Sequence, residues 1–181
     1  VNIAVSRLIA YGLSGDAVAV LYLANRLVEL PLGIFVISVT TVAFPDLSRL
    51  AAGNRHREFA EAYARGMRLI FAVTLPAAAG LILLREPILN CLFLWGNFGA
   101  GDVSRTAPVL AVFSLGLPFY ASSILSVRGF HALKDMRTPF RLAGLIFFIN
   151  IGATLLLMRP LGLIGFAVAN VFSMAVHSGL L

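Results

Sequence analysis

Arg26 and Glu29 are two charged residues inside a long apolar stretch that we predict to form a helix over residues 16–44. Arg26 lies ten residues after Asp16, which in an α-helix is roughly 15 Å and close to the middle of a bilayer. An arginine at that depth costs at least about 2.5 to 3.5 kcal/mol, so it should face a protein interior or a wet cavity. Glu29 shares its helix face and is its nearest partner. We favour a cationic contact for an anionic substrate, and the alternative is an ion pair that only fixes helix packing.

A second group of polar residues lies near the carboxyl end of the sequence. Asn150 and Thr154 are one helical turn apart in one apolar stretch, and Asn170, Ser173 and His177 follow one stripe of the next stretch. We expect these two polar faces to meet across adjacent helices. Interhelical hydrogen bonds worth about 0.6 kcal/mol each are the favoured interpretation. The alternative is a cation or proton site formed by Asn150, Thr154 and Asn170.

Three prolines, Pro31, Pro76 and Pro118, fall within three separate apolar stretches. Proline removes a backbone donor and clashes with the carbonyl four residues earlier, so we expect a helix kink at each position. Bendable helices are typical of transporters that work by alternating access, although prolines are common in membrane helices generally.

No motif for catalysis or metal binding is found in the sequence. Cys91 is the only cysteine, so the chain cannot form an internal disulfide or a paired-thiolate metal site. A phosphate-binding Walker loop, H-E-x-x-H and G-x-S-x-G are all absent. The sequence therefore predicts a protein that is not an enzyme and that uses neither a cofactor nor a metal.

Composition shows which elements must position these residues. Hydrophobic residues make up 60% of the chain and charged residues 12%, against about 25% charged in soluble proteins, and the mean hydropathy is +0.94. Because the apolar residues occur in runs of roughly 20, the length that spans a bilayer, the chain is predicted to be an all-α bundle of transmembrane helices. The net charge of +6 then indicates membrane orientation and lipid headgroups rather than binding to nucleic acid.

We predict one transmembrane domain over residues 1–181, and we expect it to be a piece of a longer protein. The stretch 1–12 looks like the tail of a cut helix, and the last stretch is still apolar where the sequence stops. The predicted spans are 1–12 (partial), 16–44, 67–84, 105–130, 140–158 and 161–181.

Basic residues between the spans predict the orientation, because Lys and Arg in short loops favour the cytoplasm. One side is predicted to be cytoplasmic because it has nine of them, whereas the other has four. The nine are Arg49, Arg55, Arg57, Arg65, Arg68, Arg128, Lys134, Arg137 and Arg141, and the four are Arg7, Arg85, Arg105 and Arg159. Residues 47–66 between the first two complete spans are interpreted as a cytoplasmic loop, either an amphipathic surface helix or an ordinary solvated connector.

Five short motifs in register resemble the MurJ (MviN-type) lipid II flippase family of the multidrug/oligosaccharidyl-lipid/polysaccharide exporter superfamily. The first, Tyr-Leu-Ala-Asn-Arg-Leu-Val-Glu-Leu-Pro-Leu-Gly over 22–33, is similar to the family's Tyr-x-Ala-Asp-Arg-Leu-x-Glu-x-Pro-x-Gly signature. The others are Phe-Pro-Asp-Leu-Ser (44–48), Leu-Pro-Ala (75–77), Gly-Asn-Phe (96–98) and Asp-Met-Arg-Thr-Pro (135–139).

The resemblance implies part of the second lobe of a two-lobe, alternating-access transporter in the bacterial cytoplasmic membrane. Its implied substrate is lipid II, an undecaprenyl-pyrophosphate-linked precursor of the cell wall, and its implied partners are membrane lipids and the remaining helices of the full-length chain. Arg26 and Glu29 fall on the family's cavity arginine and the glutamate that follows it. Asn25 stands where the family commonly has aspartate, which leaves the surroundings of Arg26 more cationic. Thr154 is neutral where a cation site could use a carboxylate.

Two other functions remain open from the sequence. One is export of a different polyprenyl-linked glycan, and the other is a membrane scaffold that keeps the fold without transporting. A membrane transferase is disfavoured because the predicted cytoplasmic loops lack an acidic metal-binding cluster, which Asp135 alone cannot supply.

Overall fold

The computed structural model describes residues 15–93 and 99–181. Every secondary-structure element in this part of the chain is a helix, which confirms the all-α class. The motif at 96–98 and the partial span at 1–12 lie outside the described residues. In order, the elements are α2 (Gly15–Pro31), a π-helical turn η1 (Leu32–Val36), α3 (Ile37–Ala52), α4 (His56–Leu83), α5 (Arg85–Phe93), α6 (Ala100–Leu115), α7 (Leu117–Ala132) and α8 (Arg137–Leu180).

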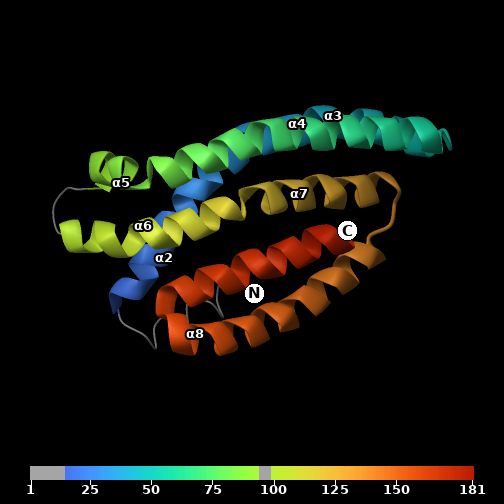
Figure 1. The fold of residues 1–181 in the computed structure, drawn as a ribbon. Helices are drawn as coiled ribbons and strands as arrows, with labels where there is room; N and C mark the ends of the chain where they lie inside the picture. Colours follow the sequence, from blue (N-terminus) through green and yellow to red (C-terminus); the bar gives the residue numbers. More distant parts are fainter. Residues whose placement is uncertain (1–14, 94–98) are drawn as a thin grey trace.

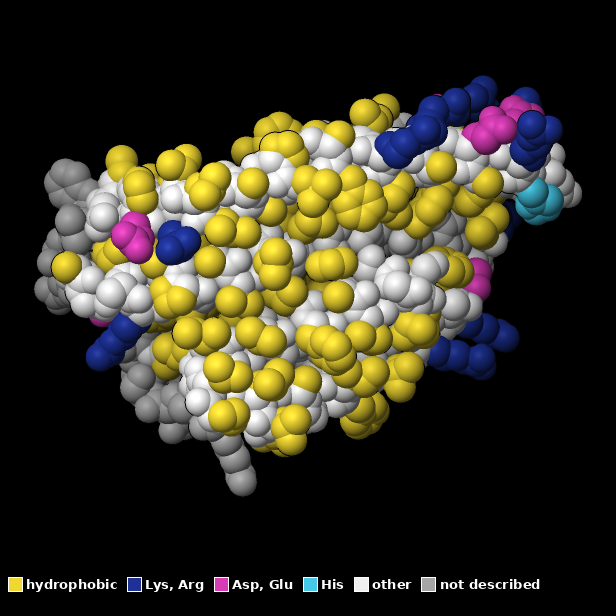
Figure 2. Space-filling view, in the orientation of Figure 1, with side chains coloured by type: hydrophobic (Ala, Val, Ile, Leu, Met, Phe, Trp, Pro, Cys, Tyr) yellow, Lys and Arg dark blue, Asp and Glu magenta, His cyan; other side chains and the backbone are white. Residues whose placement is uncertain are grey.

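Within the described ranges 15–93 and 99–181, four helical segments are long and apolar enough to cross a membrane, namely Ala17–Ala52, His56–Leu83, Arg137–Met158 and Pro160–Leu180. A fifth span is possible if α6 and α7, which meet at an angle of 41°, are counted as one broken helix. Figure 2 shows hydrophobic side chains over the middle of the molecule and charged side chains gathered toward its two ends. This distribution fits helices whose ends reach water and whose sides face lipid.

The first complete span extends to Ala52, eight residues beyond the predicted end at Phe44. Pro45 lies inside α3 without ending it. Leu47 and Leu50, about half a turn and one and a half turns farther on, are buried. Leu47 packs in a core cluster with Ile70 of α4 and Leu125 of α7. The apolar burial of these leucines offsets the backbone hydrogen bond that the proline removes.

The connection between α3 and α4 is also shorter than the predicted loop 47–66. Only Gly53–Arg55 separate the two helices, and α4 runs without interruption from His56 into its apolar part. Asn54 has a φ of 53°, a left-handed conformation that asparagine tolerates better than most residues. Residues 47–66 were predicted to be either a surface helix or a solvated connector. Instead, residues 47–52 end α3 and residues 56–66 form the first turns of α4.

The three prolines occupy different structural positions. Pro31 ends α2 and is followed directly by the π-helical turn, and the chain changes direction between α2 and α3 (Figure 1). Pro76 lies inside the continuous helix α4. The bend expected at Pro118 lies instead at Gly116, because Pro118 occupies the first turn of α7, where a backbone donor has no helical partner to lose.

The last two predicted spans form a hairpin inside α8. Gly162 has a φ of 57° and a ψ of −130°, a conformation that glycine adopts without strain, and the chain turns back at this residue (Figure 1). The connections between α3 and α4 and between α7 and α8 lie at the same end of the bundle. We call this end the hairpin end, and it is the side that the basic residues predict to be cytoplasmic.

Two apolar clusters hold the bundle together. One contains residues of α2, α6 and the second half of α8, with Leu110 and Leu117 fully buried at its centre. The other lies nearer the hairpin end, where Ile70 and Leu125 are buried between α3, α4 and α7. Together they leave one side of α2 exposed within the described structure, and that side carries the candidate site.

Candidate functional site

The two faces of α2 differ sharply in composition. Ala17, Val20, Ala24, Leu27 and Val28 are buried, at the spacing of three and four residues that defines one side of a helix. The opposite side carries the polar residues of the first motif. The sequence thus forces Asn25, Arg26 and Glu29 outward by packing the intervening apolar residues inward.

Glu29 forms hydrogen bonds with the other two predicted site residues, Asn25 and Arg26. Its Oε1 accepts a hydrogen bond of 2.7 Å from Asn25 Nδ2, and its Oε2 accepts one of 3.1 Å from Arg26 Nη1. Both donors lie one helical turn before the glutamate, where side chains on a helix surface meet. Because one carboxylate balances one guanidinium and the amide is neutral, the set carries no net charge.

The Arg26–Glu29 pair is exposed in the described structure, with 65% of the arginine side chain and 48% of the glutamate side chain accessible. Among the described residues, Glu29 is the hydrogen-bonding partner of Arg26. A guanidinium has five N–H donors, so most of them remain available to a ligand or to other parts of a longer chain.

The polar residues of α8 pair in a pattern that only partly follows the prediction. Asn150 Nδ2 donates to Ser173 Oγ at 3.2 Å, which joins the two halves of the hairpin. Asn170, in contrast, accepts a hydrogen bond of 2.9 Å from the hydroxyl of Tyr120 on α7. Thr154 is buried, and its hydroxyl has no hydrogen-bond partner within the described residues.

A polar seam that the sequence interpretation missed joins α7 to its neighbours. Ser123 Oγ lies 2.8 Å from His177 Nδ1, and Ser122 Oγ lies 2.6 Å from Ser178 Oγ. Ser126 Oγ lies 2.7 Å from the hydroxyl of Tyr63 on α4. The signal was present, because three serines within five residues of an apolar stretch must find partners once buried. The seam is best explained as hydrogen bonding between helices.

No group of three or more His, Cys, Asp or Glu side chains that could hold a metal ion occurs in the ranges 15–93 and 99–181. Outside the spans, Asp135 accepts hydrogen bonds from the hydroxyl and backbone N–H of Thr138 and from the backbone N–H of Arg137. These contacts, led by the Thr138 hydroxyl, lower the pKa of Asp135. Asp135 is therefore occupied in capping the start of α8.

Comparison with known proteins adds the family context of this geometry. The family model described as "Lipid II flippase MurJ" matches residues 1–181. The probable lipid II flippase MurJ of Rhizobium meliloti (strain 1021) is 35% identical over 181 residues, which is all of this chain and 34% of that protein. The probable lipid II flippase MurJ of Haemophilus influenzae is 32% identical over 188 residues, covering all of this chain and 36% of that protein.

Among solved structures, one described as "Lipid II flippase MurJ, inward closed conformation" matches with a TM-score of 0.89 and 28% identity. It covers 99% of this chain and 38% of its own. The chain therefore spans about a third of the length of the curated relatives that it matches.

Proposed function

Because the chain belongs to the lipid II flippase MurJ family, we propose that the full-length protein moves lipid II from the inner to the outer leaflet of the bacterial cytoplasmic membrane by alternating access. The family and the apolar helices identify a multi-pass protein of the bacterial inner membrane. A transporter rather than an enzyme is the class that this family name implies.

The observation that carries the residue-level proposal is the open position of Arg26 inside an apolar span. Its side chain is accessible although it lies on a helix that qualifies as a membrane span, Ala17–Ala52. Such a charge is costly in lipid and is retained where it meets a polar cavity or a ligand. Lipid II carries a pyrophosphate, and charge-assisted hydrogen bonds from a planar guanidinium suit phosphate oxygens.

We propose that Arg26 helps to neutralise the pyrophosphate while the polar head crosses a wet cavity and the prenyl tail stays in lipid. When no substrate is bound, Glu29 balances the arginine and orients it. Substrate phosphate then competes with the Glu29 carboxylate for the Arg26 N–H groups. Asn25 adds no charge of its own, so an anion meets one carboxylate here instead of the two that an aspartate at this position would create.

The test is translocation of lipid II in vesicles by full-length protein with Arg26→Gln. A hydrogen bond to a charged group contributes about 1.5 to 3 kcal/mol, so we expect transport to fall by roughly tenfold to a hundredfold at limiting substrate. Arg26→Lys should retain part of the activity, since it keeps the charge but loses the planar fork.

A matched control is Arg57→Gln, which also removes one cation but from a side chain that is 92% exposed at the hairpin end. Its transport should stay within about twofold of the parent. Equal transport by Arg26→Gln and the parent, at equal protein levels and equal thermal stability, would overturn the role of Arg26. Competition by lipid II against other undecaprenyl-linked sugars identifies the glycan that is carried.

A further inference from the structure

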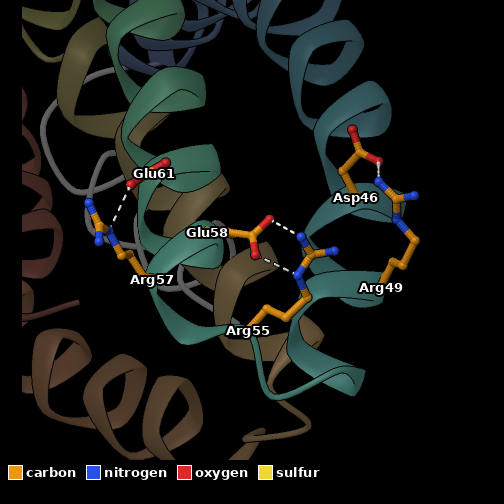
Figure 3. Close-up of polar contacts among 6 residues, drawn as sticks. All are labelled: Asp46, Arg49, Arg55, Arg57, Glu58 and Glu61. Atoms are coloured by element: carbon orange, nitrogen blue, oxygen red, sulfur yellow. Dashed lines mark hydrogen bonds and ion pairs between the residues drawn. The ribbon is translucent and has the colours of Figure 1, made fainter.

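The hairpin end carries more cations than its own acidic residues can balance. Between positions 46 and 68 there are five arginines and three acidic residues. Each acid forms an ion pair within one helical turn (Figure 3): Asp46 with Arg49 at 3.1 Å, Glu61 with Arg57 at 3.3 Å, and Glu58 with Arg55 through both carboxylate oxygens. These pairs neutralise three of the five arginines.

The two remaining cations are Arg65 and Arg68, on the same face of α4. Neither forms an ion pair within the described residues. Arg68 donates only to the backbone carbonyl of Ala64, at 3.3 Å, and Arg65 lines a cavity of about 270 Å³ between the end of α3 and the start of α4. The same cavity is lined by Arg49 and Arg55 and by the carboxylates of Asp46, Glu58 and Glu61, so Arg65 is its one cation without an ion pair among the described residues.

The position of these two arginines along α4 is as informative as their charge. Leu69, Ala72 and Leu75 follow them at helical spacing and are exposed, the two leucines by 58% and 56%. This face of α4 therefore changes from ion-paired residues, through two unpaired arginines, to apolar side chains within about three turns. This order matches that of the groups in a phospholipid: the arginines lie where the phosphate would be, at the water boundary, and the apolar side chains lie where the acyl chains would be.

We propose that Arg65 and Arg68 hold the phosphate of an anionic phospholipid of the cytoplasmic leaflet, whose acyl chains lie along the exposed apolar face of α4. The phosphate lies against Arg65 and Arg68 on the outside of α4, because the carboxylates of Asp46, Glu58 and Glu61 also line the cavity and would repel a phosphate inside it. A headgroup without its own ammonium fits best, because the excess charge at this end is positive. The ion pairs keep the other arginines from competing for the phosphate.

This site is separate from the candidate substrate contact. Arg26 lies 23 residues before Arg49, which lines the cavity beside Arg65, and along the continuous span Ala17–Ala52 this is roughly 35 Å in a helix. The lipid at α4 is thus a resident of the membrane, whereas lipid II is proposed to meet Arg26. The proposal depends on the hairpin end facing the cytoplasm and is independent of flippase activity.

The test is native mass spectrometry of purified full-length protein titrated separately with phosphatidylglycerol, phosphatidylethanolamine and lipid II. The variant is the double substitution Arg65→Gln and Arg68→Gln. The control is the double substitution Arg55→Gln and Arg57→Gln. It removes the same charge from the same end, but both of its arginines form ion pairs with glutamates. Each arginine near a lipid surface contributes roughly fivefold in affinity, so the first variant should lose between fivefold and twenty-five-fold in phosphatidylglycerol binding.

The control should lose less than twofold, and phosphatidylethanolamine binding should change little in either variant. Substituting both residues by lysine should keep most of the binding, which guards against a variant that merely misfolds. Equal losses in the two glutamine variants would mean a general effect of surface charge and would overturn the proposal. A selective loss of lipid II, with phosphatidylglycerol unchanged, would also overturn it.

Discussion

At the scale of single residues, Glu29 determines how Arg26 is presented. The carboxylate accepts hydrogen bonds from both Asn25 and Arg26, so each of its oxygens is used. This arrangement restrains the guanidinium while leaving the pair exposed. Glu29 is therefore both the partner that orients Arg26 and the anion that a substrate phosphate must displace.

Glu29→Gln separates these two roles in full-length protein. If competition with the substrate dominates, removal of the negative charge should tighten lipid II binding by roughly threefold to tenfold and slow its release, because a neutral amide opposes an anion less. Binding and single-turnover release are measured with the same vesicles. Weaker binding would instead show that the carboxylate acts mainly by positioning Arg26.

A second substitution at this site is Asn25→Asp, which introduces the aspartate that the MurJ family commonly has at this position. The substitution places a second carboxylate about one turn from Glu29. It also removes the hydrogen bond that the Asn25 amide donates to Glu29. Lipid II binding should weaken by a few fold, with an effect that shrinks as salt is raised. Binding that tightens would contradict the charge argument.

At the scale of elements, the hairpin inside α8 depends on close backbone approach. A Cβ at Gly165 would lie against the carbonyl oxygen of Leu157, closer than real Cβ contacts come. Gly162, three residues earlier, has the left-handed φ of 57°. The hydrogen bond from Asn150 to Ser173 then holds the two halves together farther along.

Gly165→Ala should consequently destabilise the protein by about 1 to 3 kcal/mol, because overpacking against a backbone atom forces the two halves apart. Gly152→Ala is the matched control, since a Cβ there meets nothing within 4 Å and alanine favours the helix more than glycine. Thermal unfolding of full-length protein in the same detergent compares the two. A Gly165→Ala variant as stable as the control would contradict the close approach seen here.

At the scale of the whole molecule, the two helix connections with most of the basic residues lie at one end. Figure 2 shows this as dark blue side chains concentrated toward that end, with an apolar belt between the two ends. The positive-inside tendency then predicts that the hairpin end is cytoplasmic and the α5 end external.

Labelling of single cysteines with a membrane-impermeant maleimide tests this orientation in full-length protein with Cys91→Ser. Glu86→Cys, near the start of α5, should react in intact spheroplasts, because its side chain is exposed at the external end. Arg57→Cys should react only after permeabilisation. The reverse pattern would invert the orientation and would contradict a lipid of the cytoplasmic leaflet at Arg65 and Arg68.

Much of the fold could be read from the sequence because a bilayer is a demanding solvent. Every backbone polar group must be satisfied inside it, so long apolar runs have to be helical, and the all-α class follows from composition and run length. The face on which Asn25, Arg26 and Glu29 lie also follows from local spacing, as do the ion pairs of the hairpin end, which are three or four residues apart. Such contacts need only helix geometry.

Contacts between residues distant in sequence were decided by the tertiary structure alone. Asn170 pairs with Tyr120 and not with Asn150, and α3 continues through Pro45, because packing between helices outweighs local preference. The pairing of three acids with three arginines follows from spacing, but the cavity beside Arg65 exists only because α3 and α4 turn back sharply at Gly53–Arg55. Local spacing thus determined which side chains share a helix face, whereas the packing of one helix on another decided what those faces meet.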